Sequence, residues 1–318
     1  MQIRRLCSLF LCVALLAGCA QSSLTGRKQL LLVSEQEAVS GSAQAYAQMM
    51  GQLEKKKQIE AGTPRVEKVR EVTERLIAQA VRFRPDAADW AWDVRVIDDP
   101  KTVNAFCMAG GKMAIYSGMW EQVHVTDDEI AQVMGHEIGH ALANHTQERM
   151  SIALATSVAT QVAAIAISSR TDSPAAGLAL SGTALAAALA IQLPNSRESE
   201  AEADQIGIEL AARAGYDPKA AVSLWDKMGK LDGGKAPPEF LSTHPAPEHR
   251  AARLAALGGQ LEPYYAAAKA KPTQAPSFLA GSKPKPGEMT RAEYAAKVSQ
   301  ERDSLTFLRK PAASPPGK

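Results

Sequence analysis

Cysteine is scarce in this sequence, with four residues among 318. Cys7 and Cys12 lie in an N-terminal leader that we expect to be removed, and Cys19 is a predicted lipidation site. Cys107 then remains alone, which excludes an internal disulfide framework even in an oxidising compartment. Because Cys107 lies in an apolar, strand-like run, we predict that it is a buried packing residue and not a nucleophile.

Long apolar runs are missing from the N-terminal region as well. The run from Leu6 to Ala17 is too short to form a stable transmembrane helix. Arg4 and Arg5 precede it, and this order is typical of a secretory leader, which we place at residues 1–18. The leader ends in Leu-Ala-Gly before Cys19, which resembles a bacterial lipobox and predicts a lipid on that cysteine. Secretion with cleavage at another site is the alternative.

A lipid on Cys19 would hold the protein at a membrane. More than one acyl chain gives durable anchoring, because each buried methylene contributes ~0.8 kcal/mol. Ala20 follows the cysteine, which in lipoproteins of this type resembles an outer-membrane address. We therefore expect a cell-envelope protein, lipid-anchored at the outer membrane and facing the periplasm, with residues 19–33 as a tether.

Neither sign of charge dominates, since 36 Lys+Arg oppose 34 Asp+Glu and leave a net charge of +2. No basic stripe interleaves with aromatic residues, so the pattern excludes nucleic acid as a partner. The length and the 46% hydrophobic fraction suit one domain, predicted at residues 34–259. Residues 260–318 are rich in Pro, Lys and Ala. They predict a largely disordered tail with a short helix from Thr290 to Leu308.

Histidine is also rare, with six residues, yet His136 and His140 flank Glu137 in an H-E-x-x-H pattern. Residues four apart leave the same face of a helix, so both rings could bind one metal ion. A zinc ion with three protein ligands keeps a position for water, and Glu137 could act on that water as a general base. The pattern alone is also compatible with a helix that carries two surface histidines.

The sequence around this pattern favours a well-specified helix. Thr126 and Glu129 form a capping box, and apolar residues recur at helical spacing from Ile130 to Leu142. Gly135 and Gly139 would weaken an ordinary helix by up to ~1 kcal/mol each relative to Ala. Their presence predicts that another element passes close by.

A third ligand is predicted at the start of a second helix, from Asn195 to Ala214. Glu200 and Asp204 are four residues apart and share a face. Glu200 could bind the metal, and Asp204 could accept the remaining ring N–H of a ligand histidine. The alternative is a solvated acidic face.

His244 lies in a loop made rigid by Pro245. It could donate a hydrogen bond to the oxyanion of a tetrahedral intermediate, or it could occupy the open zinc position in a resting enzyme. The alternative is a loop histidine that caps the following helix, predicted from Pro247 to Leu257.

These pieces together resemble the M48 family of zinc metallopeptidases over roughly residues 34–259, and the short bacterial lipoprotein members most of all. The matching motifs occur in the family's order: Asn104-Ala105-Phe106 with Gly110-Gly111, His136-Glu137-Ile138-Gly139-His140, Ser196-Arg197 with Glu200 and Ala203-Asp204, and Thr243-His244-Pro245 with Arg250.

The resemblance implies a mostly helical α+β, zincin-like fold with one Zn²⁺ per chain. It implies that His136, His140 and Glu200 bind zinc, Glu137 is the catalytic base, His244 assists catalysis or blocks the metal at rest, Asp204 supports a ligand, and Arg250 stabilises developing negative charge or supports the structure.

A small sheet is predicted just before the zinc helix. Trp90 to Ile97 alternates like a strand, and Lys101 to Met108 with Lys112 to Ser117 suggests a hairpin. The resemblance implies that an edge strand near Met113 to Tyr116 lies over the active site, where an extended substrate could pair with it.

Residues 151–193 contain two Ala-rich apolar runs and predict a helical hairpin. Its place stays open among three alternatives: buried under the zinc site, a flexible lid or plug over the cleft, or dipped into or spanning a membrane.

The function predicted is a zinc-dependent endopeptidase. The resemblance implies misfolded or stalled envelope proteins as substrates and contact with envelope assembly machinery. A rival from another class is an outer-membrane protein assembly factor or chaperone whose zinc site is latent. A secreted, toxin-like protease fits poorly, because the lipid would hold the chain at its own cell.

Overall fold

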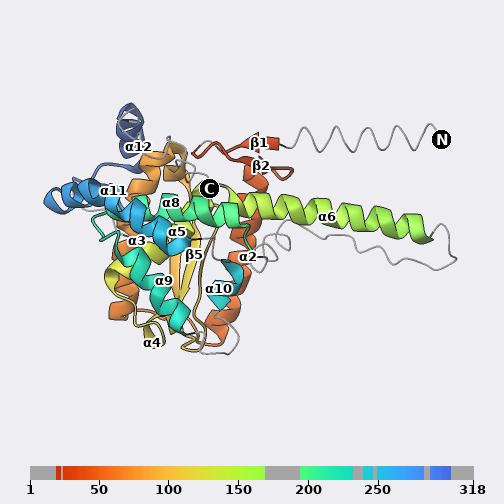
Figure 1. Cartoon of the computed structure of the whole chain (residues 1–318), viewed down its shortest axis with the longest axis horizontal. Helices are drawn as coiled ribbons and strands as arrows, with labels where there is room; N and C mark the ends of the chain where they lie inside the picture. The colour runs from red at the N-terminus through yellow and green to blue at the C-terminus, as the bar shows by residue number, and fades with distance from the viewer. Residues whose placement is uncertain are drawn as a thin grey trace.

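The computed structural model describes residues 19–22, 24–168, 194–231, 239–245, 249–282 and 287–301. The predicted leader at residues 1–18, the second Ala-rich run and the last 17 residues lie outside this part of the chain. The described part is mostly helical, with a small sheet before the H-E-x-x-H helix (Figure 1). This arrangement confirms the predicted α+β, zincin-like fold.

The sheet has three strands in the order β3-β5-β4, where β3 is Asp93–Ile97, β4 is Ala105–Met108 and β5 is Lys112–Tyr116. β4 and β5 form the predicted antiparallel hairpin, and β3 pairs with β5 in parallel. The edge strand beside the site is therefore β4, and the expectation of an edge near Met113 was wrong. The physical reason is that β3 occupies the other side of β5.

Helices surround this sheet, and several begin at a residue whose side chain caps the first turn. Thr63, Thr126, Ser196 and Thr290 each accept a backbone N–H of the first helical turn with their side chains. The described helices are α2 Glu35–Lys55, α3 Pro64–Phe83, the 3₁₀ turn η1 Pro85–Asp89, α4 Gly118–Glu121, α5 Asp127–Leu142, α6 His145–Ser168, α8 Arg197–Arg213, α9 Ala220–Lys230, α10 Glu239–Thr243, α11 Arg250–Ala270 and α12 Arg291–Gln300.

α5 lies at the centre of the molecule, between β4 on one side and α3 and α8 on others (Figure 1). Every residue from Glu129 to Leu142 is buried. A Cβ added at Gly135 would lie 2.7 Å from the Gly207 carbonyl oxygen, and one added at Gly207 would lie 2.6 Å from the His136 nitrogen. The two glycines therefore let the backbones of α5 and α8 touch, which explains the small residues singled out in the sequence.

Residues 19–33 belong to the fold, which corrects the expectation of a simple tether. β1 (Cys19–Gln21) and β2 (Lys28–Leu30) pair as an antiparallel hairpin. Gln29 is buried, and its amide donates to the Ala143 carbonyl at 2.7 Å. Arg27 forms ion pairs with Glu148 of α6 and Glu202 of α8. This packing could not be predicted from the sequence, because its contacts are polar and join residues that are far apart along the chain.

The described part of the predicted tail also packs, so the expectation of disorder was wrong for residues 260–282, whereas the helix predicted from Thr290 is present as α12. α11 continues to Ala270, beyond the predicted end at Leu257. Phe278 and Tyr294 are fully buried against the main core. Glu74 accepts the backbone N–H of Phe278 and of Leu279. A few well-spaced apolar residues therefore anchor a segment whose average composition is polar.

α6 leaves the body as a long rod (Figure 1). It covers the first predicted Ala-rich run, whereas residues 169–193 lie outside the described part. Ile152 and Leu154 are 46% and 38% exposed, so the start of this run is not buried under the site. Among the described residues, no helix combines the length and apolarity needed to cross a membrane.

Candidate metal centre

His136 and His140 point from the same face of α5, as the spacing predicted, and both rings are buried. The capping box of Thr126 and Glu129 fixes where this helix begins, which sets the face that the histidines share. Their Nε2 atoms lie 3.0 Å apart. Two neighbouring ring nitrogens at this distance can bind one ion between them.

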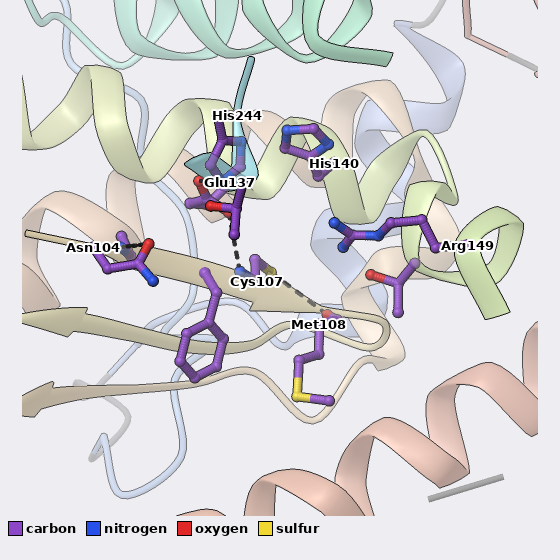
Figure 2. A pocket seen from close by; sticks show the side chains of 11 residues that line it. Asn104, Cys107, Met108, Glu137, His140, Arg149 and His244 are labelled. Carbon is purple, nitrogen blue, oxygen red and sulfur yellow. Dashed lines mark hydrogen bonds and ion pairs between the residues drawn. The ribbon is translucent and has the colours of Figure 1, made fainter. Parts of the chain in front are cut away.

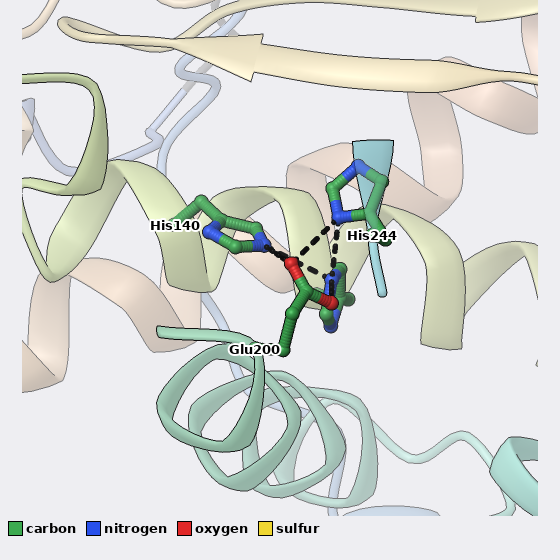
Figure 3. A group of neighbouring side chains, drawn as sticks. His140, Glu200 and His244 are labelled. Atoms are coloured by element: carbon green, nitrogen blue, oxygen red, sulfur yellow. Dashed lines mark hydrogen bonds and ion pairs between the residues drawn. The ribbon is translucent and has the colours of Figure 1, made fainter. Parts of the chain in front are cut away.

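Glu200 and His244 complete a cluster of four ligand atoms that all lie within 4.8 Å of one another (Figure 3). Glu200 Oε1 is 3.2 Å from His140 Nε2, and Glu200 Oε2 is 3.4 Å from His136 Nε2. His244 Nδ1 is 2.9 Å from Glu200 Oε1 and 3.3 Å from His136 Nε2. Tetrahedral zinc with ligands at ~2.1 Å places neighbouring ligand atoms roughly 3.4 Å apart. The observed spacings and the three-histidine, one-carboxylate donor set fit that geometry.

His244 therefore contributes a ring nitrogen to the cluster itself. α10 and the following turn carry it, and Phe240 stacks on it with ring centroids 4.3 Å apart. Its other nitrogen, Nε2, lies 3.5 Å from Glu137 Oε1. This placement brings Nδ1 into the cluster as a fourth possible ligand atom. The ring also remains close to the Glu137 carboxylate.

Asp204 and Arg250 lie behind the ligands. Asp204 Oδ1 is 3.1 Å from His136 Nδ1, the ring nitrogen that faces away from the cluster. Arg250 pairs with Asp204 at 2.6 Å and with Glu200 at 3.3 Å, and its guanidinium stacks on Trp225. Arg250 does not line the cavity beside Glu137, so its contacts correspond to support of the ligand carboxylate rather than to an oxyanion site.

The electrostatics of the cluster favour a bound cation. Burial lowers the pKa of His136, but Glu200 and Asp204 outweigh it and raise that pKa to about 9. Burial raises the pKa of Glu200, yet His244 and His136 together hold it well below its usual range. The site thus keeps its carboxylate ionised and attracts positive charge, which a metal ion supplies without a bound proton.

Glu137 faces a small cavity between α5 and β4 (Figure 2). The backbone N–H of Cys107, at the free edge of β4, donates to Glu137 Oε2 at 3.2 Å. Burial raises the pKa of Glu137, although His244 and His136 oppose this shift. A carboxylate with a raised pKa is a better proton acceptor near neutral pH.

Cys107 is buried as predicted. Burial and the neighbouring Glu137 raise the pKa of its thiol well above the usual value, so the thiolate that a nucleophile needs is disfavoured. The residue serves the site through its main chain.

Three further residues contact the site although no sequence motif predicted a role for them there. Arg149 of α6 lines the cavity and donates to Asn195 Oδ1 at 2.7 Å. Asn195 Nδ2 lies 3.2 Å from His244 Nδ1. His145 Nδ1 lies 2.8 Å from His140 Nδ1. Burial lowers the pKa of His145, which disfavours the charged form of its ring. Their partners are remote in sequence or lie across a helix break, so spacing alone gave no signal.

The model of peptidase family M48 matches residues 64–257 of the chain, which cover the sheet and all four ligand residues. The chain belongs to peptidase family M48. This match confirms the family that the sequence motifs resembled.

Several curated members of the family are similar to this chain. The mitochondrial metalloendopeptidase OMA1 of Arabidopsis thaliana is 39% identical over 165 residues, which cover 52% of this chain and 31% of the plant protein. The mitochondrial metalloendopeptidase OMA1 of Danio rerio is 32% identical over 250 residues, or 74% of this chain and 49% of that protein. The beta-barrel assembly-enhancing protease of Escherichia coli K12 is 34% identical over 166 residues, or 51% and 33%. The matched region thus spans less than half the length of each of these relatives.

Proposed function

We propose that this M48 peptidase is a zinc-dependent endopeptidase that hydrolyses peptide bonds of periplasmic or outer-membrane proteins. The observation that carries the proposal is the cluster of His136, His140, Glu200 and His244 with the Glu137 carboxylate beside it. The names of the relatives, metalloendopeptidase and protease, support the reaction class.

His136, His140 and Glu200 would hold one zinc ion per chain. When bound, zinc would polarise the scissile carbonyl and lower the pKa of a nearby water towards ~7. Glu137 accepts the proton of that water and later delivers it to the leaving amine, a role that its raised pKa suits. His244 is placed to donate a hydrogen bond to developing negative charge once its ring leaves the ligand cluster.

β4 is the element that would orient the substrate. The Cys107 N–H lies on the side of β4 that β5 does not cover, and it donates to Glu137 Oε2 at 3.2 Å. Backbone groups at an open edge can pair with an extended peptide whatever its side chains. The cavity beside this edge then supports cleavage of unfolded segments with loose sequence preference.

The location is a proposal from the sequence. Lipidation of Cys19 would tether the enzyme to the outer membrane, facing the periplasm, and would give it misfolded envelope proteins as substrates and the envelope assembly machinery as a neighbour. The name of the Escherichia coli relative, a beta-barrel assembly-enhancing protease, supports this setting. Palmitate labelling of cells that produce the wild type and Cys19→Ala tests it, and equal labelling would contradict it.

The test of the reaction compares Glu137→Gln with the wild type. Glutamine keeps the shape of the side chain but cannot accept the proton, so casein cleavage should fall by at least ~10²-fold while zinc per chain is unchanged. Glu71→Gln, a change at an exposed helix residue far from the site, serves as the control. Equal cleavage by wild type and Glu137→Gln would exclude Glu137 as the base, and a wild type without zinc would exclude the ligand assignment.

A second candidate is an assembly factor or chaperone with a latent zinc site. It is favoured by one observation, the placement of His244 Nδ1 among the ligand atoms. Cells that carry Glu137→Gln in place of the wild type separate the two functions. A role in hydrolysis fails in these cells, whereas a binding role survives.

A further inference from the structure

A chain of buried polar groups runs from the metal ligand His140 to the N-terminal hairpin. His140 Nδ1 lies 2.8 Å from His145 Nδ1, and His145 Nε2 lies 3.0 Å from Glu202 Oε2. Arg27 and Thr25 of the hairpin bind Glu202 in turn. His140, His145 and Glu202 are each at least 95% buried.

Chemistry fixes the direction of the hydrogen bonds in this chain. His140 turns Nε2 towards the ligand cluster, so its proton must reside on Nδ1 when Nε2 binds a metal. That N–H has one acceptor within 3 Å among the described residues, the unprotonated Nδ1 of His145. His145 then carries its own proton on Nε2, and an ionised Glu202 can only accept it. In this series of side chains, each donor therefore faces an acceptor, and each histidine is restricted to one tautomer.

The break between α5 and α6 makes this contact. Residues five apart on one continuous helix point ~140° away from each other and do not meet. Here α5 ends at Leu142, Asn144 adopts a left-handed conformation with φ of 58°, and α6 begins at His145. The turn brings the His145 ring back against His140.

We propose that His145 is a positioning residue for the metal ligand His140, and that Glu202 and Arg27 hold His145 in place. The inference rests on the metal site proposed above. His136 obtains its support directly from Asp204, whereas His140 depends on a neutral imidazole that must itself be oriented. Arg27 also pairs with Glu148, so the hairpin bridges α6 and α8 around this ring.

Zinc affinity of the mature chain, measured by competition with a chromophoric chelator, tests the role of His145. His145→Phe keeps a ring of similar shape but offers no acceptor, and it should weaken zinc binding by about 10- to 100-fold. His145→Asn places an acceptor oxygen where Nδ1 was, and it should bind zinc more tightly than the Phe variant. His124→Asn, at an exposed histidine, is the control and should match the wild type.

A packing role for His145 predicts the opposite order, with Phe tolerated better than Asn, and that order would overturn the proposal. The cobalt(II) absorption spectrum adds a readout independent of cleavage, since a misoriented His140 changes the ligand field. Circular dichroism of the metal-free proteins checks folding, and His145→Ala takes the place of the Phe variant should that variant not fold.

Arg27→Met tests the far end of the chain. It should weaken zinc binding measurably, by about threefold, whereas Arg65→Met should not, because Arg65 pairs with Glu60 and Glu121 away from the site. Equal affinity of Arg27→Met and the wild type would overturn the link to the hairpin. If the wild type itself binds no zinc, the metal site fails; if it binds zinc and every His145 variant binds equally well, only the role of His145 fails.

Discussion

His244 turns its two ring nitrogens towards two different parts of the site. Nδ1 lies among the ligand atoms, and Nε2 faces the carboxylate of Glu137. A ring that fills the fourth ligand position competes with any other group that could bind the metal there. At the scale of the residue, this placement predicts competition between the His244 ring and any other ligand beside Glu137.

Removal of this ring should open the position. We expect His244→Ala, loaded with zinc, to bind a small hydroxamate roughly tenfold more tightly than the wild type, because the ligand no longer displaces the imidazole at a cost of about 1.4 kcal/mol. Isothermal titration measures the difference. His124→Asn provides the control for a change at an exposed histidine, and an unchanged affinity in His244→Ala would show that the ring does not hold the position.

At the scale of the element, the contact between α5 and α8 sets the spacing of the ligands. His136 and His140 come from one helix and Glu200 from the other, and the two backbones meet at Gly135 and Gly207. Rigid elements in direct contact hold side chains more accurately than loops do. The glycines that weaken each helix locally are what allow the pair to assemble.

Gly207→Ala should therefore damage both the fold and the site. Its new Cβ would lie 2.6 Å from the His136 nitrogen, so the helices must separate, with a loss of about 1–3 kcal/mol in the free energy of unfolding. Gly229→Ala in α9 is the matched control. Apart from its own helix backbone and chain neighbours, no heavy atom would lie within 4 Å of a Cβ there, and alanine should stabilise by about 0.5–1 kcal/mol. Urea denaturation measures both variants, and a neutral Gly207→Ala would contradict the close contact.

At the scale of the whole molecule, structure that depends on neighbouring residues could be predicted from the sequence. Structure that depends on contacts between distant segments could not. Thr126 marked the start of a helix because a cap acts on the next three residues. The order of the strands was not predictable, since the parallel pairing of β3 with β5 depends on chain segments that are not neighbours in sequence. His145 was overlooked because the left-handed Asn144 changes which residues face each other. The packing of Phe278 rests on contacts more than 200 residues apart.

The stability of the whole fold should also depend on pH through Glu129. Burial raises the pKa of this side chain, but Lys227, Ser223 and the backbone of Thr126 outweigh burial and lower it below the ordinary value of 4.5. Below pH 4.5 the unfolded chain binds a proton that the folded chain still excludes, so acid favours unfolding. The contribution is complete above pH 4.5 and is lost as pH falls through the folded pKa.

Glu129→Gln removes this dependence while an amide keeps the capping box. Urea denaturation of the metal-free proteins should show the wild type more stable at neutral pH, with the difference shrinking as pH falls from 5 to 3. Lys227→Met should likewise be less stable than the wild type at neutral pH, because it removes the ion pair with Glu129. A difference between wild type and Glu129→Gln that grows in acid would contradict the assignment.

The backbone contact between Gly135 and Gly207 also bears on how long a metal ion stays. His136 sits on one side of that contact and Glu200 on the other helix, so the ligands cannot spread apart while the glycines touch. Loss of the ion by separation of His136 from Glu200 would then require the two helices to part, which is a step of partial unfolding. Denaturant that promotes this separation should raise the rate at which zinc leaves by that route.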